Sequence, residues 1–296
     1  MKKAAPFLII LAGALWGSMG LFVRRLNAMG LDSMEISEVR GIMAVIILVI
    51  FLLIRDPGKL KLKPRNLPPL ACSGIFSILF FNYCYFSAIS VMDLSIAAVL
   101  LYTAPIFVML LSLPLFREKL TWKKVLALIL AFSGCCLVSG VTDSTAAIST
   151  KGLLLGLGAG LGYALYSIFS RFSLNQGLSS MSITVYTFVF MAIGGAFLTD
   201  FSAIGRVLSE YGVGFVAFAV LYSLITTVLP YLLYTTGLTY VENGAASVMA
   251  STEPVVATIM GFAVFSEVPT VSAGIGIVLV LTALVILNLS GRKKTA

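Results

Sequence analysis

The chain has 296 residues, of which 59% are hydrophobic and only 11% are charged, and its mean hydropathy is +1.06. An average soluble domain carries about 25% charged residues, so this much apolar surface excludes an ordinary water-soluble protein. The formal net charge is +8 at pH 7, but the basic residues are spread over several short segments, which argues against a nucleic-acid partner. We expect a multi-pass membrane protein embedded in a lipid bilayer.

Stretches of about 20 apolar residues, each long enough to cross about 30 Å of hydrocarbon as a helix, can be placed ten times. They are expected near residues 6–26, 35–54, 68–89, 94–116, 121–141, 151–171, 181–200, 212–237, 243–265 and 269–289. The first stretch ends in GLFVRRLN, which lacks the small-residue cleavage pattern of a signal peptide, so it is expected to remain in the protein. The connections are short, and no soluble domain is expected.

Lys and Arg are distributed unevenly between the two sides that ten spans would create. The N-terminus, every second connection and the C-terminus share one side, where most of the 20 basic residues fall. The largest groups are Arg55, Lys59, Lys61, Lys63 and Arg65, then Arg117, Lys119, Lys123 and Lys124, then Arg292, Lys293 and Lys294. Because cytoplasmic loops are enriched in Lys and Arg, we predict that both termini are cytoplasmic.

Residue types that carry catalytic or metal chemistry are scarce. The chain has no histidine, which excludes Ser-His hydrolysis, haem ligation by His and His-based proton relays. The four cysteines lie within apolar spans without metal-ligand spacing. The aspartates map to loops or span ends, whereas an intramembrane aspartyl protease needs two deep ones. These residues are Cys72, Cys84, Cys135 and Cys136, and Asp32, Asp56, Asp93, Asp143 and Asp200. We therefore expect no enzyme, no metal and no cofactor.

Two segments of the chain resemble each other. Residues 97–121 read AAVLLYTAPIFVMLLSLPLFREKLT, and residues 246–270, which lie 149 positions later, read ASVMASTEPVVATIMGFAVFSEVPT. This indicates a duplicated unit of five spans, with a first repeat over residues 1–145 and a second over residues 146–296. A unit with an odd number of spans must place its second copy upside down in the bilayer. Inverted halves give many secondary transporters two openings around one midplane site.

Four prolines lie inside the predicted spans, namely Pro105, Pro114, Pro230 and Pro254. Proline removes a backbone hydrogen bond and bends or loosens a helix, and membrane helices tolerate this where the freed groups are buried or line a cavity. Pro105 and Pro254 are equivalent in the duplication. They form either a paired hinge or an inherited packing kink.

The repeated pattern resembles the drug/metabolite transporter (DMT) superfamily, and within it the EamA family of bacterial exporters. The motifs that carry the resemblance are AAVLLYTAPIFVMLLSLPLFREKLT with its second copy, the early ALWGSMGLFVRR, and EVRGIMA at the start of span 2. The resemblance covers almost the whole chain. It implies ten transmembrane helices as two inverted five-helix repeats, with helices 1, 3, 4, 6, 8 and 9 around a central cavity. It also implies the bacterial inner membrane.

Several residues match the family pattern. Trp16 matches its Trp-Gly, and Tyr163 is the positional partner of Trp16 in the second repeat. Arg40 matches the common Arg at the start of span 2 and is expected either to serve in gating or structure or to snorkel to the outer surface beside its neighbouring glutamates. Glu118 and Glu267 are expected at opposite membrane faces, where each either accompanies a helix cap or latches the closed state on its own side.

Glu253 is expected near the bilayer midplane, where a charged acid costs about 2.5–3.5 kcal/mol on insertion scales and usually faces an internal pathway. The equivalent residue of the first repeat is Ala104, and two residues earlier Ser251 replaces Tyr102. Function in a pseudo-symmetric site is expected where the symmetry is broken. Three roles are open for Glu253: proton coupling or gating, binding of a cationic group, and a hydrogen bond to backbone freed near Pro254.

The remaining expected cavity residues are aromatic or mildly polar. They are Asn82, Tyr83, Tyr85, Tyr102, Tyr163, Tyr166, Tyr222, Tyr231 and Thr252. Tyrosine faces and one acid favour an amine or ammonium group. No deep Lys or Arg is evident in the sequence to hold a phosphate.

The sequence therefore predicts an inner-membrane carrier that exports an amino acid or related amine by alternating access, as a monomer or weak dimer, with protons as a candidate coupling ion. The alternatives are a multidrug or organic-cation exporter and an uncoupled facilitator. A channel is disfavoured because the chain has no ring of identical filter segments, and a membrane-embedded enzyme lacks histidines and paired acids.

Overall fold

The computed structural model describes residues 2–141, 149–266 and 268–292, with side chains to residue 287. Described residues form helices and turns, without a strand. The first half contains α1 (Ala5–Gly17), α2 (Met19–Ala28), α3 (Ser33–Arg55), η1 (Pro57–Leu60), η2 (Pro64–Asn66), α4 (Leu67–Cys72), η3 (Ser73–Leu79), α5 (Phe80–Ile89), α6 (Leu94–Leu101), α7 (Ala104–Phe116) and α8 (Trp122–Val138). The second half contains α9 (Thr150–Asn175), α10 (Ser180–Gly195), α11 (Phe201–Ser223), η5 (Leu224–Val228), α12 (Leu229–Leu238), α13 (Asn243–Ala250), α14 (Thr252–Phe265) and α15 (Val271–Arg292). Segments η3 and η5 are π-helical.

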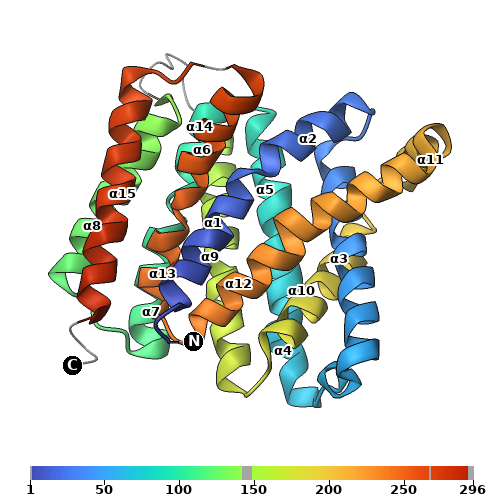
Figure 1. Ribbon diagram of the computed structural model, residues 1–296, viewed down its shortest axis with the longest axis horizontal. Coiled ribbons are helices and arrows are strands. Elements are labelled where there is room, and N and C mark those ends of the chain that lie inside the picture. The colour runs from blue at the N-terminus through green and yellow to red at the C-terminus, as the bar shows by residue number, and fades with distance from the viewer. Residues whose placement is uncertain (1, 142–148, 267, 293–296) are drawn as a thin grey trace.

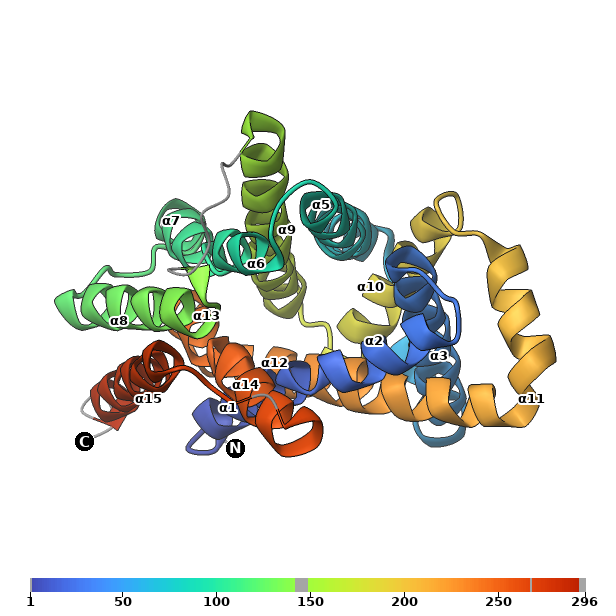
Figure 2. The same cartoon turned by 90° about the horizontal axis from the view of Figure 1, so that it is seen from above.

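Within the described part of the chain, 7 helical stretches are long and apolar enough to cross a bilayer, and two shorter apolar helices accompany them. The expected all-helical membrane architecture is confirmed, whereas the count of ten crossings stays a prediction. The N-terminal end of α1 and the C-terminal end of α15 lie at the same lower end of the bundle (Figure 1). Helices α8 and α15 pack along each other at one side of the molecule, and α11 lies at the opposite side (Figure 2).

Residues 201–211 differ from the sequence expectation, which left them as a connection between two spans. They form the first part of α11, capped by the Asp200 side chain, which accepts a hydrogen bond from the Ser202 backbone N–H at 2.9 Å. At Gly212 the backbone turns (φ 53°, ψ −131°), and the chain changes direction sharply there (Figure 2). Glycine is suited to this position because it has no Cβ to oppose a positive φ. The predicted span therefore begins at the kink, and a short additional helix precedes it.

The duplication is visible in the backbone. The broken helix α6–α7 has its break at Tyr102, and the broken helix α13–α14 has its break at Ser251, 149 positions later. Each break lies shortly before the proline that was expected to bend the span. Arg117 and Ser266, which end α7 and α14, both have a left-handed conformation, with φ of 54° and 57°.

Helix caps and irregular segments repeat in the same way. The Thr121 hydroxyl caps α8, and the equivalent Thr270 hydroxyl accepts from the Ala273 backbone N–H at the start of α15, as expected from the sequence. The π-helical segments η3 and η5 end at Leu79 and Val228, again 149 positions apart. Turns of π-helix are frequent at functional sites. The helices that contain this equivalent pair are therefore candidates for the functional site.

Candidate functional site

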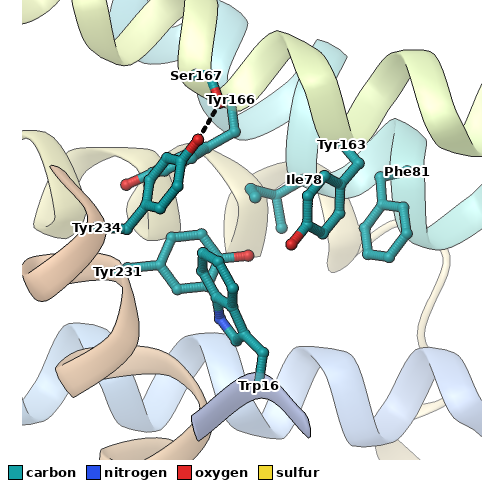
Figure 3. A pocket seen from close by; sticks show the side chains of 8 residues that line it. All are labelled: Trp16, Ile78, Phe81, Tyr163, Tyr166, Ser167, Tyr231 and Tyr234. Carbon is teal, nitrogen blue, oxygen red and sulfur yellow. Dashed lines mark hydrogen bonds between the residues drawn. The ribbon is translucent and has the colours of Figure 1, made fainter. Parts of the chain in front are cut away.

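Two small cavities lie where the broken helices meet the centre of the bundle. The first, here called the aromatic cavity, is lined by Trp16, Ile78, Phe81, Tyr163, Tyr166, Ser167, Tyr231 and Tyr234 (Figure 3). The second, here called the glutamate cavity, is lined by Leu101, Tyr102, Ala104, Pro105, Tyr163, Ser247, Ala250, Ser251 and Glu253. These residues come from spans 1, 3, 4, 6, 8 and 9, the six helices that the family resemblance implied. Tyr163 lines both cavities.

Aromatic rings pack edge to face around the aromatic cavity. The Trp16 ring lies 5.2 Å from the Tyr231 ring and 6.1 Å from the Tyr163 ring, measured between centroids, and Tyr166 lies 4.8 Å from Tyr231. The hydroxyls of Tyr163 and Tyr231 point into the space between the rings (Figure 3). Among the described residues, the buried indole N–H of Trp16 has no hydrogen-bond partner. The cavity wall therefore offers ring faces and phenol hydroxyls.

Two of the tyrosine hydroxyls are already engaged on the far side of this cavity. The Tyr166 hydroxyl lies 2.7 Å from the Thr235 hydroxyl, and the Tyr234 hydroxyl lies 2.7 Å from the Ser167 hydroxyl. Both bonds join α9 to α12, two helices of the second repeat. Tyr166 and Tyr234 are therefore fixed wall residues, because buried hydroxyls seldom give up a partner without a cost in free energy.

Glu253 lines the glutamate cavity and is linked to the aromatic cavity through Tyr163. Its carboxylate accepts a hydrogen bond from the Tyr163 hydroxyl at 3.0 Å. It lies in the first turn of α14, directly after the break at Ser251, and the N-terminal end of a helix favours negative charge. A deep carboxylate is thus held by a phenol and by the positive end of a half-helix.

Thr252 has a different position from the one expected. Its hydroxyl donates to the Met249 carbonyl at 2.9 Å, three residues earlier, and lies 3.3 Å from the Ile10 carbonyl of α1. It also packs on Gly13 of α1, where a Cβ atom would lie 2.5 Å from the Thr252 hydroxyl oxygen. Thr103, just before α7, and Gly160 of α9 repeat this contact with the two halves exchanged, also at 2.5 Å. In both contacts a glycine of one half lets a broken helix of the other half approach closely.

Arg40 is buried, which contradicts the snorkelling alternative. Its side chain is 3% exposed, and its Nη1 lies 3.5 Å from the Met19 sulfur. Its Nε has no hydrogen-bond partner among the described residues. The neighbouring Glu35 and Glu38 are buried as well, with 5% and 2% exposure. The charged side chains at this end of α3 are therefore buried in the protein and do not reach solvent.

Other predicted residues lie outside the two cavities. Tyr83 is 52% exposed on the outside of the bundle. Asn82 is buried and donates to the Ser37 hydroxyl, and Tyr222 stacks on Phe22 with 5.5 Å between centroids. Tyr85 stacks on Phe81 behind the aromatic cavity. The structure does not bring these four tyrosine and asparagine side chains to the cavity walls.

Tyr234, Ser247 and Phe81 also line the cavities, although they were not predicted from the sequence. Tyr234 lies three positions after Tyr231, so both project from the same face of α12. This spacing was the available signal. Ser247 carried none, because a serine in an apolar span is compatible with any face.

Glu118 forms a polar cluster at the end of the bundle that the positive-charge distribution predicts to be cytoplasmic. Its carboxylate accepts from the backbone N–H groups of Asn243, at 2.6 Å, and Gly244, at 3.2 Å, and so caps the N-terminus of α13. Lys124 lies 3.5 Å from Glu118 and also pairs with Glu242. Arg171 donates to the Asn243 side-chain oxygen at 2.8 Å. Glu267, its expected counterpart, lies outside the described residues.

The family model for the EamA-like transporter family matches residues 3–140 and 150–289, once for each half. The chain belongs to the EamA-like transporter family. An uncharacterized transporter of Archaeoglobus fulgidus is 29% identical over 282 residues, which are 94% of each chain. The uncharacterized transporter YxxF of Bacillus subtilis is 27% identical over 284 residues, covering 94% of this chain and 88% of YxxF.

A solved crystal structure matches 100% of this chain and 100% of its own chain with a TM-score of 0.80 at 16% identity, which shows that the fold is shared. The family-model match over both halves confirms the predicted family. A membrane transporter of two EamA repeats is the function that this membership supports directly.

Proposed function

We propose that this EamA-like protein is a secondary transporter that exports a small amino acid or related amine by alternating access. The observation that carries the proposal is the Tyr163–Glu253 hydrogen bond of 3.0 Å, which joins an ionisable group of the glutamate cavity, at the helix break, to a tyrosine that lines both cavities. An ammonium group would be attracted to this carboxylate and to the surrounding ring faces.

The cavities are too small for a metabolite, so the site must open before it can bind one. Their volumes are about 10 Å³ and 20 Å³, and roughly 10–15 Å³ is needed to hold a single water molecule. A metabolite therefore needs a wider arrangement than this one. The breaks before Pro105 and Pro254 supply the moving parts, because each half-helix can tilt where its backbone ladder is interrupted.

Closure on one side is supported by the Glu118 cluster. Glu118 of the first repeat holds the first turn of α13 from the second repeat, and Lys124 adds a contact across the same junction to Glu242. Arg171 holds the Asn243 side chain from within the second repeat. Movement of α13 away from Glu118 would open the glutamate cavity toward this side, since Ser247 of α13 is part of its lining. Alternating access then requires these contacts to break once in each cycle.

Purified protein in proteoliposomes tests the proposal. Vesicles loaded with one unlabelled amino acid or amine are diluted into trace labelled compound, and a carrier shows saturable uptake that is stimulated by the internal pool. Uptake that rises linearly with concentration and ignores the internal pool would instead indicate a channel. Chemically altered product would indicate an enzyme. Preferred movement of large hydrophobic cations would favour the multidrug alternative, and flux unaffected by a proton gradient would favour an uncoupled facilitator.

A further inference from the structure

Arg40 is a second buried charge near the proposed site, and the described structure leaves part of it unsatisfied. Its guanidinium makes one contact of hydrogen-bond length within the described residues, to the weak acceptor Met19 Sδ, while Nε has no partner. No carboxylate oxygen described here lies within ion-pair distance of it. Burying an unpaired charge is costly unless a partner compensates it, so the protein gains something from this guanidinium.

The position of Arg40 relates it to the aromatic cavity. Met19, its contact, is the first residue of α2 and packs against the buried cluster that contains Trp16 and Tyr231. Trp16 lines the cavity. The cation therefore lies close behind one wall of the site, with the acid on another.

The second repeat shows that the fold does not require charge at this position. Gly30 and Gly177, both with positive φ, lie 147 positions apart, as do the helix caps Asp32 and Ser179 that follow them. The same offset pairs Arg40 with Thr187. That hydroxyl is fully buried and donates to the Ser73 hydroxyl at 3.0 Å. At this equivalent position the second repeat therefore packs with a neutral, hydrogen-bonded side chain and needs no charge.

We propose that Arg40 binds the anionic group of the substrate, so that the transported compound is a zwitterion with a carboxylate as well as an amine. The proposal rests on the proposed function and narrows it from amines in general to amino acids. Arg40 and Glu253 are both charged where the other repeat has a neutral residue. Together they provide a positive group for the substrate carboxylate and a negative group for its amine. A guanidinium suits the task because its planar fork of N–H donors matches a carboxylate with two parallel hydrogen bonds.

Fluorescence of Trp16 provides a direct binding readout. The chain has 2 tryptophans, and Trp122 is 69% exposed at the start of α8, so Trp122→Phe leaves Trp16 as the only indole. Each standard L-amino acid other than tryptophan and tyrosine is titrated into this protein and compared with its own amide and its decarboxylated amine. We expect at least one amino acid to change the emission while its amide and amine bind at least about tenfold more weakly, for a lost interaction of ~1.5 kcal/mol or more.

The Arg40→Gln variant sharpens the comparison. It is expected to weaken binding of that amino acid by about ten- to a hundredfold and to leave the amide within about twofold, whereas Arg40→Lys retains part of the preference. Arg206→Gln, on the exposed first part of α11, is the matched control and should change nothing. Equal binding of acid and amide by the parent protein overturns the proposal even without a variant. So does an equal loss of both in Arg40→Gln, and so does the absence of any amino-acid response.

Transport is measured separately, so that the two proposals can fail independently. An amino acid that binds through Arg40 without entering proteoliposomes would refute the transporter proposal and leave the Arg40 assignment standing. Saturable flux of an amine, with no preference for the amino acid from which it derives, would support the transporter proposal and refute the Arg40 assignment.

Discussion

The Glu118 carboxylate accepts a hydrogen bond from the Asn243 backbone N–H at 2.6 Å, although 125 residues separate them. The two repeats are therefore joined at this end of the bundle by a side chain of one and a helix terminus of the other. Lys124 supports the carboxylate from α8. This capping bond stabilises the closed arrangement and can break reversibly when α13 moves away. A gate needs both properties.

Glu118→Gln is expected to loosen this gate, because the neutral amide keeps the shape but loses the charge that pairs with Lys124 and with the helix terminus. Ser247→Cys, in a background without the four native cysteines, then reports on opening. We expect its reaction with impermeant maleimide in inside-out vesicles to accelerate about tenfold, for a loss of ~1.4 kcal/mol. Glu210→Gln, on the exposed part of α11, is the control. An unchanged rate would leave Glu118 with a capping role alone.

Glu267 occupies the position equivalent to Glu118 in the duplication, and its sequence context predicts a gate at the opposite face. Glu267→Gln should therefore slow the same reaction of Ser247→Cys from the inner side, by favouring the outward-open state. Labelling from both membrane sides measures the direction of the shift. Changes of the same sign for both glutamines would refute paired gates.

Gly13→Ala and Gly160→Ala test the close packing of the broken helices. A Cβ atom would lie 2.8 Å from the Ala250 carbonyl oxygen in the first case and 2.8 Å from the Leu100 carbonyl oxygen in the second. Such overlap with backbone is expected to cost about 1–3 kcal/mol, seen as a lower unfolding temperature in detergent. Gly20→Ala is the matched control, since nothing lies within 4 Å of its Cβ position, and it should be neutral or slightly stabilising. An unchanged unfolding temperature in Gly13→Ala and Gly160→Ala would show that the broken helices do not depend on this close contact with their neighbours.

The sequence predicted the fold more fully than the cavity walls. Long apolar stretches, their prolines and the 149-residue repeat located the helices and both breaks, because membrane thickness and backbone hydrogen bonding dictate these features. The helix over residues 201–211 escaped prediction because it is short, partly polar and separated from the next span only by the turn at Gly212.

Cavity walls were harder to predict for a physical reason. A membrane helix is apolar on all sides, so its composition does not tell which face turns inward. Tyr83 was therefore assigned to the cavity although it is 52% exposed, and Tyr234 was missed. For Arg40 two alternatives stayed open, because a charge near a span end can reach solvent or lie buried, and only the three-dimensional arrangement distinguishes them.

The predicted orientation can be tested on described residues at opposite ends of the bundle. Lys61 lies in the basic connection after α3, and Asn27 lies at the end of α2, and both are exposed. In a cysteine-free background, Asn27→Cys is expected to react with impermeant maleimide in intact cells, and Lys61→Cys only after the cytoplasmic side is opened. Thr145, in a connection outside the described residues, should behave like Asn27. The reverse pattern would invert the orientation, and reaction of Asn27→Cys and Lys61→Cys from one side would refute the span count.

Tyr163→Phe and Glu253→Gln together decide what the central hydrogen bond does. Tyr163→Phe removes one donor to the carboxylate without changing the ring, and Glu253→Gln removes the charge while keeping an acceptor for the phenol. If Glu253 is the coupling acid, Glu253→Gln abolishes transport driven by a proton gradient while exchange between equal pools survives, because exchange needs no net protonation change.

If Glu253 instead binds the ammonium group of the substrate, Glu253→Gln weakens binding about ten- to a hundredfold, for ~1.5–3 kcal/mol of a hydrogen bond to a charged group. Tyr163→Phe then has the smaller effect, because the carboxylate keeps its charge and its place at the start of α14. Initial rates of gradient-driven uptake and of exchange, together with affinities from Trp16 fluorescence, separate these outcomes. Unchanged uptake and affinity in Glu253→Gln would reject both roles and leave Glu253 as a structural partner of the broken helix, in which case Gly13→Ala and Glu253→Gln should lower the unfolding temperature to a similar extent.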